Sequence, residues 1–175
     1  PLTNRLEASL YAEGYAAVAG LDEAGRGPLA GPVSAGVAVL PRSPKGDWVN
    51  LINDSKKLTP KQRDTAYAQI KTEAIAVTVG VSSPREIESM GIASATRLAM
   101  KRALELTPVK PDYLLLDAFP LPGVNLPQRA IIKGDADVLS IATASIAAKV
   151  ERDRLMDQVS AHYPNYGFAS NKGYG

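Results

Sequence analysis

The chain has 175 residues, of which 45% are hydrophobic and 22% charged; this composition indicates one globular domain and excludes a disordered chain. Its net charge is only +2, so charge alone does not indicate a nucleic-acid partner. There is no cysteine and His162 is the single histidine, which excludes thiolate and histidine-rich metal sites. The absence of cysteine makes a reducing cytoplasm the expected compartment. No apolar run reaches the ~20 residues that span a membrane, so no membrane contact is expected.

The first half of the chain is predicted to form two strands around a glycine-rich turn, then a helix and a third strand. The predicted strands are residues 16–24, Val33–Leu40 and Ala74–Ser82. A loop is expected at residues 41–48. The helix is predicted from its start, where Thr59 is the N-cap, Pro60 the first helical residue and Gln62 the partner in a capping box.

The second half alternates helix and strand. A helical stripe with steps of three and four is formed by Ile92, Ala95, Ala99, Ala103 and Leu106. The apolar run Asp112–Ala118 predicts a strand covered on both faces. It is followed by a proline-rich loop (119–128), a short strand (130–134) and a helix from about Asp137 to His162. This order predicts one α/β domain with a mixed central sheet and helices packed on it.

Acidic residues come where three of the predicted strands end. Asp22, with Glu23 next to it, comes at the end of the first strand, Asp117 ends the apolar strand, and Asp135 follows Gly134 after the short strand. Ligands collect at strand ends in open α/β sheets, and carboxylates without histidine or cysteine suit a pair of Mg²⁺ ions that could hydrolyse a phosphodiester. The same residues can equally be turn or capping acids. Neighbours on a strand point to opposite faces, so Asp22 and Glu23 are expected to share a site only if the strand bends or ends there.

The glycines after Glu23 match neither common phosphate-binding motif. Glycine allows a backbone to approach a ligand closely and to adopt positive φ. In the Gly25-Arg26-Gly27 step, main-chain groups could therefore meet a sugar or phosphate while Arg26 adds charge. A tight turn between two paired strands explains these glycines equally well.

Five segments, taken in order, resemble the successive motifs of the ribonuclease HII family. They are GLDEAGRGPLAGPV, NDSKKLTPKQRD, YLLLDA, KGDADVLSIATASIAAKVERDR and HYPNYGFASNKGYG, and the resemblance extends from about Ala17 to Gly175. It implies the ribonuclease H-like fold and hydrolysis of RNA in RNA–DNA hybrids with Mg²⁺ or Mn²⁺. It also implies nicking on the 5′ side of single ribonucleotides embedded in duplex DNA, which leaves 3′-hydroxyl and 5′-phosphate ends.

The resemblance also implies roles for individual residues. The four catalytic, metal-binding carboxylates would be Asp22, Glu23, Asp117 and Asp135, with Asp137 a weaker match for the fourth. The backbone of Gly25, Arg26 and Gly27 would read the 2′-hydroxyl, the group that separates RNA from DNA. Tyr174 would stack on the deoxyribose after the ribonucleotide.

Further residues are expected to contact phosphates or to pack. Ser55 and Lys56, and more weakly Lys57, match the phosphate-contacting loop of the family. Lys149 and Arg152, three apart on the last helix, form either a second contact face or a solvated helix face. The residues expected to pack in the interior are His162, Tyr163, Tyr166 and Phe168.

We expect residues 1–175 to be a single, monomeric catalytic domain. The family normally continues past KGYG, so a C-terminal extension is expected to be missing, and with it a segment that could bind a sliding clamp. Two alternatives stay open at this point: the related ribonuclease HIII, which usually carries an extra N-terminal domain, and a non-catalytic nucleic-acid-binding module. Asp22→Asn would leave the function of such a module intact.

Overall fold

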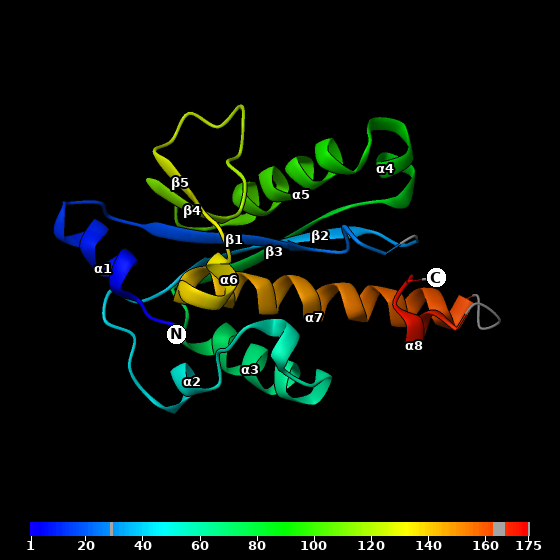
Figure 1. The fold of residues 1–175 in the computed structure, drawn as a ribbon, viewed down its shortest axis with the longest axis horizontal. Helices are drawn as coiled ribbons and strands as arrows, with labels where there is room; N and C mark the ends of the chain where they lie inside the picture. Colours follow the sequence, from blue (N-terminus) through cyan, green and yellow to red (C-terminus); the bar gives the residue numbers. More distant parts are fainter. Residues whose placement is uncertain (29, 163–166, 175) are drawn as a thin grey trace.

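A five-stranded mixed sheet forms the centre of the protein in a computed structural model that describes residues 1–28, 30–162 and 167–174 (Figure 1). Its strands are β1 (Val18–Ala24), β2 (Val33–Val39), β3 (Ala76–Ser82), β4 (Tyr113–Asp117) and β5 (Gln128–Ile131). They are ordered β3-β2-β1-β4-β5. The β1–β2 and β2–β3 pairs are antiparallel, and the β1–β4 and β4–β5 pairs are parallel. The mixed sheet predicted from the order of elements is confirmed.

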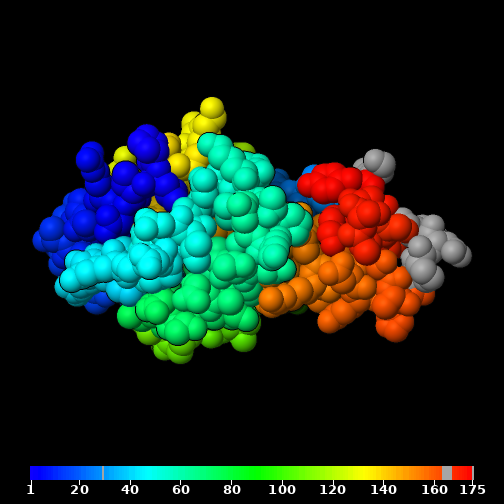
Figure 2. All heavy atoms as spheres, turned by 90° about the horizontal axis from the view of Figure 1, so that it is seen from below, coloured from blue at the N-terminus to red at the C-terminus, as the bar shows by residue number. Residues whose placement is uncertain are grey.

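Helices cover both faces of this sheet. They are α1 (Arg5–Ala12), α2 (Asp47–Asn50), the 3₁₀ turn η1 (Ser55–Lys57), α3 (Pro60–Glu73), α4 (Pro84–Met90), α5 (Ile92–Leu106), α6 (Gly134–Asp137), α7 (Leu139–His162) and α8 (Phe168–Asn171). In Figure 1, α5 lies on one face, α7 crosses the other, and α3 packs on the far side of α7. Figure 2 shows α3 and the segment before it, cyan to green, beside the orange end of α7 and the red α8. None of the helices in the described part of the chain combines the length and the apolar character of a membrane span.

Small residues let the two long helices lie very close to the sheet. A Cβ at Gly20 or Gly36 would collide with the backbone of α7, and a Cβ at Gly80 would collide with that of α5. The Ser34 hydroxyl in β2 donates a hydrogen bond of 2.7 Å to the carbonyl of Ala148 in α7. The depth of α7 against β1 and β2 is therefore fixed, which sets where its polar side chains emerge at the end of the sheet.

Apolar side chains fill the layers on both sides of the sheet. One cluster lies between the sheet and α5 and includes Leu21, Val37, Leu114, Leu116 and Met100. A second joins α7 to α3 and α2 and includes Ile146, Val150, Ile70, Tyr67 and Trp48. Because both faces of β4 are covered, Leu114, Leu115 and Leu116 are all fully buried, as the continuous apolar run predicted.

Several predicted boundaries near the site are wrong by a few residues. The strand expected at 130–134 is β5, which ends at Ile131 because Lys133 has a left-handed backbone with φ 56°. The helix expected from Asp137 begins at Leu139, since Val138 is extended and separates α6 from α7. The first strand, predicted for residues 16–24, begins at Val18 and ends at Ala24 as predicted. These shifts place α6, with Asp135, between β5 and the long helix.

A capping box starts α3 as predicted. The Thr59 hydroxyl accepts from the Gln62 amide, and the Gln62 side chain accepts from the Thr59 amide. The same signal starts α4, where Ser83 and Glu86 exchange these bonds and Pro84 is the first helical residue. This second helix start was readable from the sequence, but α4 was not predicted.

Candidate active site

Three aspartates from β1, β4 and α6 meet at one edge of the sheet. One carboxylate oxygen from each of Asp22, Asp117 and Asp135 lies within 4.8 Å of the other two. The strand register explains the first pair, because Leu21 of β1 is aligned with Leu116 of the parallel strand β4 and the next residue on each strand is the aspartate. Asp135 follows β5, the neighbour of β4, and its amide donates to Asp117 Oδ1 at 3.4 Å.

Glu23 reaches the same place from the opposite face of β1. Asp22 faces α7, whereas Glu23 faces the α5 side, where it lines a second hollow with Met100 and Phe119. β1 does not end at these acids, since it stays paired with β2 through Ala24. It is β4 that ends, at Asp117, which leaves one edge of β1 open so that side chains from both faces border one depression.

That depression has a volume of about 310 Å³, and nearly every residue predicted for the site lines it. They are Asp22, Glu23, Gly25, Arg26, Gly27, Ser55, Lys56, Asp117, Asp135, Lys149 and Tyr174. Ala24, Arg63 and Ser145 also line it, and none of these three was predicted from the sequence. Ser145 carried a readable signal, because it is a polar residue four positions before Lys149 in an alanine-rich helix and so lies on the same helix face.

The carboxylates are crowded and largely removed from water. Burial, followed by the charges of Glu23 and Asp117, raises the pKa of Asp22 well above its ordinary value. Burial also raises the pKa of Glu23, although the nearby Arg26 guanidinium at 3.9 Å acts in the opposite direction. Burial and the charge of Asp135 raise the pKa of Asp117. A bound cation would relieve this repulsion, and the all-oxygen donor set fits a hard ion such as Mg²⁺ or Mn²⁺.

Lys56 supplies positive charge to the cluster. Its Nζ lies 2.8 Å from Asp135 Oδ2, and this hydrogen bond is the main reason that the pKa of Lys56 is raised. The Asp54 carboxylate caps η1 by accepting from the Lys56 amide at 3.0 Å. The neighbouring Ser55 hydroxyl is 2.9 Å from the Ser145 hydroxyl of α7. The side chain of Lys56 is 74% exposed, so its ammonium group is also open to a ligand.

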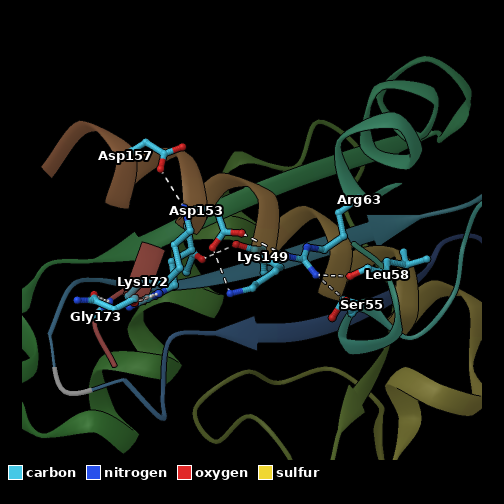
Figure 3. Close-up of polar contacts among 12 residues, drawn as sticks. Ser55, Leu58, Arg63, Lys149, Asp153, Asp157, Lys172 and Gly173 are labelled. Atoms are coloured by element: carbon cyan, nitrogen blue, oxygen red, sulfur yellow. Dashed lines mark hydrogen bonds and ion pairs between the residues drawn. The ribbon is translucent and has the colours of Figure 1, made fainter. Parts of the chain in front are cut away.

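Arg63 holds η1 against α7 (Figure 3). Its Nη1 donates to the carbonyl oxygens of Ser55 at 2.9 Å and Leu58 at 2.7 Å. Its Nη2 pairs with Asp153 Oδ2 at 3.5 Å, and Lys149 Nζ pairs with Asp153 Oδ1 at 3.1 Å. Ser55 and Lys149 are expected to contact phosphate from different segments, and they are thus connected through Arg63 and two ion pairs that share Asp153.

Arg152 is not part of a contact face, and this prediction is wrong. Its side chain is only 1% exposed and lies beneath the segments that contain Ala30, Pro32 and Lys172, to whose carbonyl oxygens it donates. Three residues along a helix turn the side-chain direction by about 300°. That rotation is enough to leave Lys149 at the rim of the depression and to direct Arg152 under a loop.

The remaining predictions near the site have mixed outcomes. His162 is exposed at the end of α7, so its prediction as a packing residue is wrong, and Phe168 is partly buried in α8. Tyr163 and Tyr166 lie outside the described residues. Asp137, the weaker match for the fourth carboxylate, is 58% exposed and lies 3.7 Å from the amino group of Pro1.

Comparisons with known proteins agree with the resemblance. The family model for ribonuclease HII matches residues 19–175. A ribonuclease HII of Dehalococcoides mccartyi (strain ATCC BAA-2266 / KCTC 15142 / 195) is 53% identical over 169 residues, which are 97% of this chain and 80% of that protein. The structure of ribonuclease H2 from Pyrococcus horikoshii OT3 superposes with a TM-score of 0.78 at 30% identity and covers 91% of this chain and 81% of its own. RNase HII in the PCNA complex from Archaeoglobus fulgidus superposes with a TM-score of 0.73 at 27% identity, over 91% and 82%.

The comparison with the alternative family shows a likeness in fold. A structure of Bst-RNase HIII superposes with a TM-score of 0.69 at 20% identity and covers 83% of this chain but 55% of that one. The relatives that share about half of the residues are instead ribonucleases HII, and the expected ribonuclease H-like fold is confirmed. The chain belongs to the ribonuclease HII family, and it is an endoribonuclease that acts on RNA–DNA hybrids.

Proposed function

We propose that this endoribonuclease also nicks duplex DNA on the 5′ side of single embedded ribonucleotides, and that it leaves 3′-hydroxyl and 5′-phosphate ends with two bound divalent cations. The observation that carries the proposal is the composition of the depression. Three converging carboxylates lie beside a glycine-flanked main-chain segment and an exposed tyrosine ring, and all of them border the same space of about 310 Å³.

The four carboxylates are proposed as the catalytic and metal-binding groups. Asp22, Asp117 and Asp135 would hold the ions from one side, and Glu23 would add a ligand from the other face of β1. When bound, two Mg²⁺ or Mn²⁺ ions activate water and stabilise the leaving oxygen. The contribution of the chain is to hold acids from three separate segments in a buried cluster, where their mutual repulsion favours the binding of cations.

Substrate recognition is proposed for the rim of the depression. The main chain of Gly25, Arg26 and Gly27 would read the 2′-hydroxyl, because the absence of side chains at the glycines lets a sugar come close. The Tyr174 ring, 52% exposed, would stack on the next deoxyribose.

Phosphate contacts are proposed on the other side of the same rim. Ser55, Lys56 and Lys149 would contact phosphates and fix the position of the duplex without reading its sequence. Lys57 is exposed and is not among the described residues that line the depression, so we assign it no phosphate contact.

Cleavage of defined duplexes tests this function. Duplexes with one ribonucleotide, with a full RNA strand and with DNA only are incubated with Mg²⁺, Mn²⁺ or EDTA, and the products are mapped to the nucleotide. A metal-dependent nick 5′ of the ribonucleotide, absent from all-DNA, is expected. Asp22→Asn should abolish cutting but retain duplex binding in a gel-shift assay. Equal cutting of all-DNA would refute the proposal.

We also propose that residues 1–175 act as one catalytic unit and as a monomer, which sedimentation of the purified protein can test. A sliding clamp would bind through a C-terminal extension; the Archaeoglobus fulgidus relative is described in complex with PCNA. Co-elution of a clamp with a form that carries the extension, and not with residues 1–175, would support that interaction.

A further inference from the structure

Arg152 is a buried cation whose hydrogen bonds to the described residues all go to main-chain carbonyl oxygens. Its Nε donates to Pro32 at 3.0 Å, its Nη2 to Ala30 at 3.0 Å and its Nη1 to Lys172 at 2.6 Å. At 1% exposure it is one of the largest fully buried side chains among the described residues. Removing a guanidinium from water is costly unless its donors are satisfied, so a position that retains one requires an explanation beyond packing.

The two segments that Arg152 joins are those proposed to recognise the substrate. Ala30 and Pro32 belong to the β1–β2 connection that begins with the Gly25-Arg26-Gly27 step, and Lys172 precedes Tyr174 by two residues. These segments also meet directly, because the Ala30 amide donates to the Gly173 carbonyl at 3.0 Å. In Figure 1 the β1–β2 connection and the C-terminal segment lie at the same end of α7.

Two glycines at the junction of these segments leave room for Arg152 and for the close contact between the segments. Gly25 has φ of 100°, and a Cβ there would collide with Arg152 Nε and approach the Pro32 carbonyl. Gly173 has φ of 90°, and a Cβ there would collide with the Ala30 carbonyl. The recognition segments therefore meet so closely that no side chain fits at Gly25 or Gly173.

We propose that Arg152 is a positioning residue for recognition of the RNA-to-DNA step: it fixes the Tyr174 ring relative to the main chain at Gly25–Gly27. This inference rests on the proposed function. The carbon of the Tyr174 ring nearest to Gly27 lies 3.5 Å from the position that a Cβ would occupy there, so the ring and the glycine backbone border one narrow space. Reading a ribose and the following deoxyribose together requires that these two elements stay one nucleotide apart.

The guanidinium group suits this task in a way that a lysine does not. Its planar fork directs donors to three carbonyl oxygens from two segments at once, whereas an ammonium group presents its donors from one nitrogen. Arg152 does not line the depression itself, so it acts on the substrate through the segments that it holds. A shift of about 1 Å in a positioned group can cost on the order of 10²-fold in rate.

The test compares Arg152→Lys and Gly173→Ala with the wild-type protein. Gly173→Ala strains the same junction and leaves the buried guanidinium of Arg152 in place, so it carries the test if Arg152→Lys does not fold. Arg102→Lys is the matched control, because Arg102 also donates to a carbonyl, that of Val81 at 2.8 Å, but lies on α5, away from the depression. For each protein, kcat and KM are measured on a duplex with one ribonucleotide and on a hybrid with a full RNA strand.

We expect the preference for the single ribonucleotide, as the ratio of kcat/KM values, to fall at least ~10-fold in both junction variants, with most of the change in kcat. Mapped nicks should spread to neighbouring positions in a strand where several ribonucleotides precede DNA. The rise in melting temperature on addition of Mn²⁺ should stay at the wild-type value, because the carboxylate cluster is not touched. Hydrogen exchange at the Ala30 amide should become faster in both variants and not in Arg102→Lys.

The outcomes separate this inference from the proposed function. If the wild-type protein does not nick at single ribonucleotides, the proposed function fails and this inference fails with it. If the wild-type protein nicks there but the two variants slow both substrates equally, with nick positions unchanged, Arg152 is merely structural and only this inference is overturned. Unchanged exchange at Ala30 in Arg152→Lys would overturn it as well.

Discussion

Replacing Asp22 by asparagine is expected to abolish activity and, in the absence of metal, to stabilise the protein. Asp22 is 5% exposed and shares its site with two other aspartates whose oxygens are within 4.8 Å. The introduced asparagine would keep the Oδ1 acceptor for the Glu23 amide, which donates to Asp22 at 2.8 Å, so no hydrogen bond need be lost. The change therefore removes a buried, repelled negative charge and little else.

The size of the effect follows from the geometry. Two unit charges about 5 Å apart repel by about 3 kcal/mol at an effective dielectric constant of about 20. The Lys56 ammonium, 2.8 Å from Asp135, offsets part of this repulsion, as does partial protonation of the cluster. We therefore expect a gain of about 1–3 kcal/mol, which for a chain of this size raises the melting temperature by ~2–4 °C for each kcal/mol.

The pH dependence of that gain has a definite sign. The folded-state pKa of Asp22 is raised above its ordinary value of 3.8, so the native protein binds a proton that the unfolded chain releases. Charging Asp22 thus destabilises the native state progressively as pH rises from about 3.8 through the raised pKa. The advantage of Asp22→Asn should be full above that range and should vanish below it.

Thermal unfolding in EDTA from about pH 3.5 to 8.5 measures this advantage, and cleavage assays measure the loss of turnover, expected to be at least ~10²-fold. Asp137→Asn is the matched control, because Asp137 is two residues from Asp135 but 58% exposed and outside the cluster. It should change neither quantity appreciably. A variant at Asp22 that is less stable than wild type in EDTA, or that is stabilised by Mn²⁺ as strongly as wild type, would refute the reasoning.

Three other predictions concern residues around the site and the scaffold. Glu7→Ala should lower stability by about 1–3 kcal/mol in chemical unfolding, because the buried carboxylate accepts from an amide in the first turn of α7 at 2.8 Å. Glu86→Gln should flatten the acid side of the stability profile: pairing with Arg102 lowers the pKa of Glu86 from 4.5 to about 2, so its contribution is present above pH 4.5 and is lost as pH falls toward 2. Lys56→Met should tighten Mn²⁺ binding in calorimetry, since it removes a positive charge beside Asp135. The same variant should raise KM for the duplex and reduce by about 1 the slope of log binding constant against log salt concentration.

Features that depend on neighbours along the chain were predictable from sequence. The capping box at Thr59 and Gln62 is a matter of a few adjacent residues, and it is present as predicted. The fully apolar run in β4 indicated a strand covered on both faces for the same local reason. That Asp22 and Asp117 come directly after apolar runs within their strands was also readable, and neighbouring parallel strands bring such positions to one edge of a sheet.

The tertiary structure alone decided how these pieces share space. Whether Asp22 and Glu23 can border one depression depends on where β4 ends beside β1, and the pattern of β1 does not contain that information. Arg152 has the same chemistry as any exposed helix arginine. It is buried because the β1–β2 connection, 120 and more positions before it, and the C-terminal segment, 20 positions after it, close over its side chain. A residue is buried by the segments that pack against it, and the segments that bury Arg152 come from distant parts of the chain.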